Sequence, residues 1–158
     1  LFIIGDGILK NSLEEYIKNK QLEDKIIFLG LQENPYKFLF QADCFVFSSL
    51  HEGFPNVLLE ALACNLPIIS SDCQSGPREI LSPSSNQSIL LDRDSNIELG
   101  EYGILTPINN VEKMQEAMQL IMDDKNLRNK YCNKSKQRVE EFDIKSICKK
   151  YEEIICAE

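Results

Sequence analysis

The sequence of 158 residues has no excess of positive charge and no long apolar run. Its formal net charge is −8, and beyond helically spaced lysines near the C-terminus it has no basic cluster. Proteins that follow a nucleic-acid backbone need such a basic footprint. A membrane-spanning helix needs about 20 apolar residues, and no run in this chain approaches that length. These absences argue against a nucleic-acid-binding protein and against a chain that crosses a bilayer.

Metal-binding residues are scarce as well. His51 is the only histidine, which excludes a two-histidine metal site, and a single loop histidine is more often incidental. The six cysteines form no Cys-x-x-Cys pair and lie mostly within predicted strands and helices. They indicate thiols in a reducing compartment rather than a zinc site. We therefore expect no metal centre and a cytoplasmic location.

Short apolar runs alternate with amphipathic stretches along the chain, a pattern typical of βα units and a parallel sheet. The strand runs are continuously apolar, as expected when helices cover both faces of the sheet. We predict an α/β fold, with residues 1–158 forming one domain. The predicted strands are 1–5, 25–30, 43–49, 67–71 and 102–105, and the predicted helices are 7–20, 35–42, 55–64, 77–82, 110–123, 125–141 and 143–156.

In the sequence, Glu52 precedes the predicted start of a helix and Glu60 follows it. Pro55 suits the first helical position, so the positive end of the helix faces the loop that carries Glu52. A helix start of this kind can seat a phosphate group. Glu60 has no Lys or Arg three or four residues away. Its carboxylate needs hydrogen-bond donors, which the adjacent hydroxyls of a ribose would supply, unless it belongs to a narrow solvent-facing strip with Asn56 and Ala63.

The context of the two glutamates resembles the family 4 glycosyltransferases, retaining enzymes with the two-domain GT-B architecture, whose hallmark is a Glu, seven residues, then Glu. The resemblance runs in order through most of the chain, and it rests on these stretches: Phe28-Leu29-Gly30, Asn34-Pro35-Tyr36, Ala42-Asp43-Cys44-Phe45-Val46-Phe47-Ser48-Ser49, Glu52-Gly53-Phe54-Pro55-Asn56-Val57-Leu58-Leu59-Glu60, Pro67-Ile68-Ile69-Ser70-Ser71-Asp72 and Ser75-Gly76-Pro77-Arg78-Glu79-Ile80-Leu81.

The resemblance implies that this is the C-terminal, Rossmann-like half of a GT-B fold, which binds the sugar donor. It also implies a βα unit before residue 1, whose strand would stand between the first strand and the strand at 43–49. That unit would carry the basic residues for the donor diphosphate. The acceptor-binding domain would lie outside this chain too, and any contact with the cytoplasmic membrane face would come through it. We expect the chain by itself to be inactive and poorly stable, and a sharp cooperative melt would count against this.

Residue roles follow from the same resemblance. Glu60 resembles the ribose-binding Glu of the family, and Glu52 resembles the Glu beside the transferred sugar. Gly53, Phe54 and Asn56 would offer backbone N–H groups to the donor, with close approach at Gly53 because it has no side chain. A plainer interpretation of Glu52 is an acid that stabilises the helix dipole, an effect of about 0.3–1 kcal/mol.

Three weaker features complete the site. Gly30 lies where the family seats the nucleobase, although Asn34-Pro35 is explained by helix capping alone. Arg78 is the remaining cation near the site and either faces a phosphate or pairs with Glu79. The polar segment 82–101 is expected to be a mobile loop without a catalytic part.

The implied activity is transfer of a hexose or N-acetylhexosamine from a UDP-sugar to a glycan or lipid-linked acceptor, as in cell-surface polysaccharide synthesis. The departing charge would be stabilised without a metal cofactor. Two alternatives stay open. One is a non-catalytic nucleotide-sugar-binding or regulatory domain, and the other is an epimerase of UDP-N-acetylglucosamine, against which the Glu-Gly-Phe-Pro-Asn stretch speaks.

Overall fold

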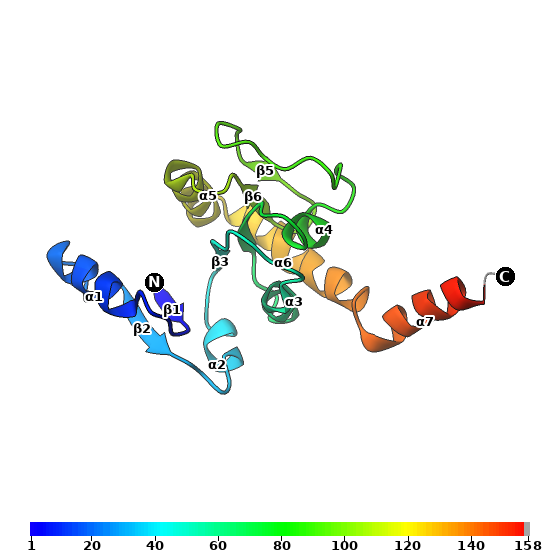
Figure 1. The fold of residues 1–158 in the computed structure, drawn as a ribbon, viewed down its shortest axis with the longest axis horizontal. Coiled ribbons are helices and arrows are strands. Elements are labelled where there is room, and N and C mark those ends of the chain that lie inside the picture. The colour runs from blue at the N-terminus through cyan, green and yellow to red at the C-terminus, as the bar shows by residue number, and fades with distance from the viewer. Residues whose placement is uncertain (157–158) are drawn as a thin grey trace. The chain divides into compact units, whose positions relative to one another are not determined.

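The computed structural model describes residues 1–156, and the chain divides after Phe38 into two compact units. Figure 1 follows the elements from the N-terminus in blue to the C-terminal helix in red. The strands form two separate sheets, and the first strand and the strand predicted at 43–49 lie in different ones.

The first unit is a βαβ motif. Strands β1 (Phe2–Ile4) and β2 (Ile27–Gly30) pair in parallel, and helix α1 (Lys10–Asn19) connects them. The register shifts by one residue where Ile4 pairs with Gly30, whose φ of +67° favours glycine. Helix α1 begins three residues later than predicted because residues 7–10 form a turn, closed by a hydrogen bond from Lys10 N–H to the Gly7 carbonyl. Helix α2 (Tyr36–Leu39) spans the boundary between the units.

The second unit is built on a four-stranded sheet with the order β3-β4-β6-β5. Strands β3 (Phe45–Phe47), β4 (Ile68–Ser71) and β6 (Ile104–Thr106) are parallel, and the two-residue strand β5 (Glu98–Leu99) joins β6 in the antiparallel direction. The sequence did not predict β5, because a two-residue strand that contains Glu98 has no apolar run. The expected loop 82–101 therefore ends in a sheet edge.

Helices cover both faces of this sheet, as the continuously apolar strands predict. Neighbouring strand residues separate onto the two faces. Ile68 and Leu105 pack in one cluster with α3 (Asn56–Ala63) and α4 (Pro77–Leu81), whereas Ile69 and Ile104 pack in a second cluster with α5 (Val111–Asp123). Helix α6 (Lys125–Glu140) contacts both α3 and α5.

The C-terminal helix α7 (Ile144–Ile155) follows α6 after a short turn and is capped by Asp143, whose carboxylate accepts from the Ser146 N–H at 2.8 Å. Its side chains are largely exposed, among them Ile144, Tyr151, Ile154 and Ile155. The three predicted helices between 110 and 156 are thus all present. Within the described residues, no helix combines the length and the apolar character that crossing a membrane requires.

Candidate functional site

The loop between β3 and α3 carries the first candidate residue, Glu52. Strand β3 is parallel to β4, so the loop leaves the sheet at the carboxyl end, where ligands bind in open α/β sheets. The half-buried Glu52 carboxylate accepts a hydrogen bond from the Ser49 hydroxyl at 2.6 Å. Burial raises the pKa of the Cys73 thiol after β4, and the Glu52 carboxylate raises this pKa further.

Helix α3 begins one residue later than predicted. Pro55 precedes the helix, with φ −79° and ψ 86°, and its carbonyl accepts from the Leu58 N–H at 2.9 Å. Asn56 is exposed, but its backbone N–H already donates to the Phe54 carbonyl at 3.0 Å. In residues 1–156, the N–H groups of Gly53 and Phe54 have no such acceptor. These two groups are therefore open to a ligand.

Glu60 lies on the open side of α3. The helix buries Leu58, Ala61 and Leu62, while Asn56 and Ala63 are exposed and Glu60 is half-buried. Across the part of the chain that the structure describes, its carboxylate has no hydrogen bond and no ion pair. The position agrees both with a donor-binding carboxylate and with the solvent-facing strip. No side-chain oxygen of the described residues is buried without a partner, so the Glu60 carboxylate is open to solvent and accessible to a ligand.

The Glu52 loop runs beside the segment that follows β4. His51 and Gln74 form a parallel bridge, and Pro55 packs against Gly76 at the start of α4. Phe54 is 42% exposed, and its ring lies 5.7 Å from the ring of Phe142. At Gly53 an added Cβ would meet nothing within 4 Å, so this part of the loop borders open space. One side of the loop thus packs against other parts of this unit, and the other side faces open space.

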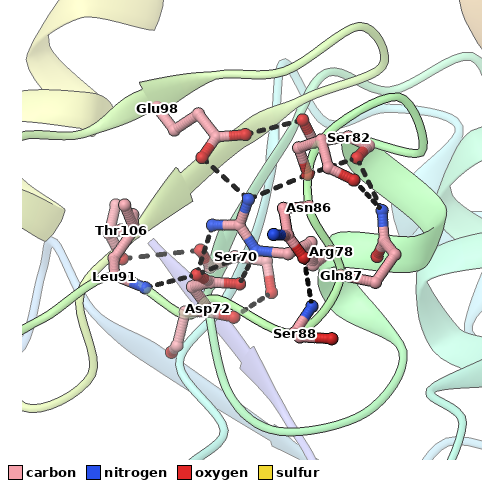
Figure 2. A network of polar contacts seen from close by, with 12 residues as sticks. Ser70, Asp72, Arg78, Ser82, Asn86, Gln87, Ser88, Leu91, Glu98 and Thr106 are labelled. Atoms are coloured by element: carbon pink, nitrogen blue, oxygen red, sulfur yellow. Dashed lines mark hydrogen bonds and ion pairs between the residues drawn. The ribbon is translucent and has the colours of Figure 1, made fainter.

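Arg78 does not pair with Glu79, one of the two predicted alternatives. Its guanidinium is buried between Asp72 and Glu98, with nitrogen-to-oxygen distances of 2.5 Å and 2.9 Å, and it also donates to the Ser85 hydroxyl at 2.9 Å (Figure 2). Burial alone would lower the pKa of Arg78, but the hydrogen bonds to Asp72 and Glu98 raise it. A donor phosphate would therefore have to displace a carboxylate to reach Arg78.

The same network fastens segment 82–101, which the sequence suggested as a mobile loop. The backbone N–H of Leu91 donates to Asp72 at 2.8 Å, and the Ser82 hydroxyl donates to Glu98 at 2.6 Å (Figure 2). Farther along, the Asn110 side chain donates to the Arg93 carbonyl at 2.7 Å. These hydrogen bonds anchor the segment at both ends and in the middle. Local periodicity in the sequence does not predict such interactions.

Gly30 belongs to the first unit. Its left-handed backbone and the hydrogen bond from the Gly5 N–H to its carbonyl at 2.9 Å explain the glycine without a ligand. The nucleobase contact predicted at Gly30 stays a prediction.

An Asp-x-Asp spacing, which the sequence reasoning overlooked, occurs at Asp92 and Asp94. Both residues are exposed, and among residues 1–156 no group of three or more His, Cys, Asp or Glu side chains is placed to hold a metal ion. All six cysteines are free. Cys148 and Cys156 are exposed, whereas Cys44 is half-buried and its burial raises the pKa of its thiol to about 12.

Comparisons with known proteins agree on one family. The model of the family described as "Glycosyl transferases group 1" matches residues 1–138. The chain is 43% identical over 171 residues to an uncharacterized glycosyltransferase of Methanocaldococcus jannaschii, covering 98% of this chain and 41% of that protein. It is 36% identical over 143 residues to the Campylobacter jejuni N-acetylgalactosamine-N,N'-diacetylbacillosaminyl-diphospho-undecaprenol 4-alpha-N-acetylgalactosaminyltransferase, covering 90% of this chain and 35% of that protein.

Among solved structures, Anabaena HepE in complex with UDP superposes with a TM-score of 0.76 at 20% identity, covering 99% of this chain and 40% of HepE. At 20% identity, this similarity supports a shared fold and nothing finer. The chain thus spans well under half the length of these proteins.

Proposed function

Because this chain belongs to the glycosyl transferases group 1, we propose that it forms the donor-binding part of a retaining glycosyltransferase that uses a UDP-sugar. The observation that carries this proposal is Glu60, a half-buried carboxylate without a partner in the described chain, on the open side of the helix that follows the Glu52 loop. The family match favours a transferase over the epimerase and the non-catalytic domain considered from sequence.

The ribose of the donor would bind at Glu60. Two neighbouring hydroxyls can each donate to a carboxylate oxygen, and hydrogen bonds to an ionised acceptor are about twice as strong as neutral ones. The bound UDP in HepE supports uridine as the nucleoside, although this choice rests on likeness of fold. The diphosphate would approach the start of α3, where the N–H groups of Gly53 and Phe54 have no other acceptor in residues 1–156.

Glu52 would stand beside the transferred sugar. The Ser49 hydroxyl holds one of its oxygens at 2.6 Å, so the carboxylate has a defined direction before any ligand arrives. In the transfer, the bond between the anomeric carbon and the diphosphate oxygen breaks, and its electron pair leaves with UDP. The acceptor hydroxyl oxygen forms the new bond, and its proton passes to the departing phosphate. A fixed carboxylate near the sugar stabilises the positive charge that develops on the anomeric carbon.

The transferred group would be a hexose or an N-acetylhexosamine, and the acceptor a glycan or a lipid-linked glycan. The name of the Campylobacter jejuni relative, with its undecaprenol-linked acceptor, supports this choice. The acceptor would bind through a part of the protein outside this chain. No metal is part of the proposed mechanism, since the start of α3 and basic residues outside this chain would receive the departing charge.

The test is nucleotide binding by calorimetry, with UDP, GDP and ADP as probes. Glu60→Ala is compared with Glu112→Ala, which removes an exposed glutamate from α5. We expect UDP to bind more tightly than the other two nucleotides. Loss of charge-assisted hydrogen bonds at Glu60 should weaken UDP binding by roughly 10- to 100-fold, with no change for Glu112→Ala. Equal binding of all three nucleotides would refute the uridine choice, and equal effects of the two variants would refute the role of Glu60.

A further inference from the structure

Phe54 in the Glu52 loop is connected to the end of helix α6 by an aromatic contact. Its ring lies 5.7 Å from Phe142, centroid to centroid, at an angle of 47°. Phe142 follows the last residue of α6 by two positions and also packs against the larger buried cluster of α3 and α4. Tilted ring pairs at this distance attract each other beyond simple burial. The side chain of Phe54 therefore has a partner although it is 42% exposed.

Arg138 also contacts Phe142. The guanidinium carbon lies 4.6 Å from the Phe142 ring centroid and 5.1 Å from the Tyr102 centroid, so two rings flank one cation. Both distances are within the range of cation–π attraction, which is stronger when the cation is withdrawn from water. Arg138 is only 6% exposed. Its planar guanidinium is suited to stacking in a way that the compact ammonium of lysine is not.

The same guanidinium also fixes helix α4. Arg138 donates from Nε to the Ile80 carbonyl at 2.9 Å, and a second nitrogen donates to the Glu79 carbonyl. These carbonyls belong to the end of a five-residue helix and have no partner within it. A third hydrogen bond goes to Glu141, the residue that directly follows α6. Arg138 thus joins α6 to α4 through an interaction that depends on the fork shape of arginine.

Helix α4 in turn braces the next residue of the Glu52 loop. Gly76 precedes α4, and a Cβ on it would lie 2.2 Å from Cδ of Pro55, so the Pro55 ring rests directly on this backbone. Phe54 and Pro55 are therefore held by two contacts, one through Phe142 and one through α4. Both lead back to Arg138.

We propose that Arg138 is a positioning residue for the Glu52 loop, which keeps the turn over 54–56 in the geometry that presents the Gly53 and Phe54 N–H groups. The role of this geometry in donor binding rests on the proposed function, whereas the positioning of the loop by Arg138 does not. The sensitive reporter is the Asn56 amide, because its hydrogen bond to the Phe54 carbonyl at 3.0 Å exists only while the turn keeps this shape.

Arg128 supplies a matched control on the same helix. Its guanidinium donates to the Ile121 and Met122 carbonyls, at 2.6 Å and 2.5 Å, near the end of α5, just as that of Arg138 does for α4. Nothing in residues 1–156 links Arg128 to Phe54 or Pro55. Arg138→Lys and Arg128→Lys therefore both remove contacts to carbonyls at the end of a helix, but only Arg138→Lys also removes the guanidinium contacts to Tyr102, Phe142 and Glu141.

The experiment measures amide hydrogen exchange in the unsubstituted chain, in Arg138→Lys, in Arg128→Lys and in Phe142→Leu. We expect exchange at Asn56 to be about tenfold faster in Arg138→Lys and Phe142→Leu, relative to the β4 amides of the same variant, and unchanged in Arg128→Lys. The buried β4 amides report global unfolding, so an increase at Asn56 that exceeds any increase at β4 reports local opening of the turn.

A second measurement uses Phe54→Trp as a reporter, because the chain has no tryptophan. Adding Arg138→Lys should make Trp fluorescence at position 54 about twofold more accessible to acrylamide, and adding Arg128→Lys should not change it. If neither measurement separates Arg138→Lys from Arg128→Lys, Arg138 only stabilises the fold and the proposal is wrong. UDP binding by the unsubstituted chain is measured separately. If Arg138 positions the loop but the chain does not bind UDP, the positioning role is supported and the donor site is refuted.

Discussion

Gly76 and Pro55 approach each other so closely that a Cβ atom on residue 76 would lie 2.2 Å from Cδ of Pro55. Gly76 also has a φ of +95°, which L side chains rarely adopt. Steric exclusion and backbone conformation therefore both require glycine between the Glu52 loop and α4.

The first prediction concerns this contact. Gly76→Ala should lower the free energy of unfolding by about 3 kcal/mol or more, because strain from positive φ adds to the clash with Pro55. Urea unfolding followed by circular dichroism measures the change. A loss below about 0.5 kcal/mol, the level of an ordinary surface substitution, would show that the loop moves away from α4 without cost.

Gly53→Ala is the counterpart in the same loop. Its φ is not in the left-handed region, and a Cβ there meets nothing within 4 Å. We expect almost unchanged stability, but UDP binding weakened by about tenfold or more, because the methyl group would occupy the space that the donor needs. Calorimetry with UDP tests this prediction, and undiminished UDP affinity in the folded variant would place the donor elsewhere.

The ion-pair network of Arg78 leads to a third prediction. Arg78→Gln leaves the fully buried Asp72 side chain without its cation and should lower stability by about 3–5 kcal/mol. Removing Lys149 from its exposed pair with Glu153, whose atoms are 4.0 Å apart, should have no measurable effect. Limited proteolysis within 82–101 should accelerate only in Arg78→Gln. Equal unfolding midpoints for the two variants would contradict the structural role of Arg78.

Alkaline pH should destabilise the fold through Tyr131. Burial raises the pKa of Tyr131 from its usual value of 10 to about 12, so between these values the unfolded chain loses a proton that the folded chain keeps. The contribution of Tyr131 is present below pH 10 and is lost as the pH rises to 12, by about 2–3 kcal/mol. Tyr131→Phe should flatten this part of the stability curve, whereas Tyr151→Phe, at an exposed position, should not. The raised pKa of Cys44 contributes to the stability curves of both variants, so only the difference between the two curves reports on Tyr131.

Metal removal gives the fifth prediction. UDP binding should be the same with EDTA as with Mg²⁺ or Mn²⁺, and Asp92→Asn combined with Asp94→Asn should not change it. The physical reason is that the proposed site receives the phosphate charge at the start of α3. A loss of affinity in EDTA that the double variant reproduces would instead identify the Asp-x-Asp pair as a metal site.

Periodicity and composition predicted most of the elements. The five predicted strands and seven predicted helices are present, usually with shorter bounds, because apolar spacing identifies an element better than it locates the ends. Helix 35–42 shortened to Tyr36–Leu39, with a turn from Leu39 to Ala42 after it. Strand β5 escaped prediction because Glu98 joins the sheet through its backbone and joins Arg78 through its side chain.

For the site, the sequence by itself determined the family, the pair Glu52 and Glu60, and the absence of a local cation for Glu60, since these depend on residues that are neighbours in the chain or one helical turn apart. Only the tertiary structure decided that Arg78 pairs with Asp72 and Glu98, that Pro55 rests on Gly76, and that Arg138 reaches the Glu52 loop through Phe142. Such contacts join residues up to about 90 positions apart, as between Phe54 and Phe142, and depend on how helices pack on the sheet.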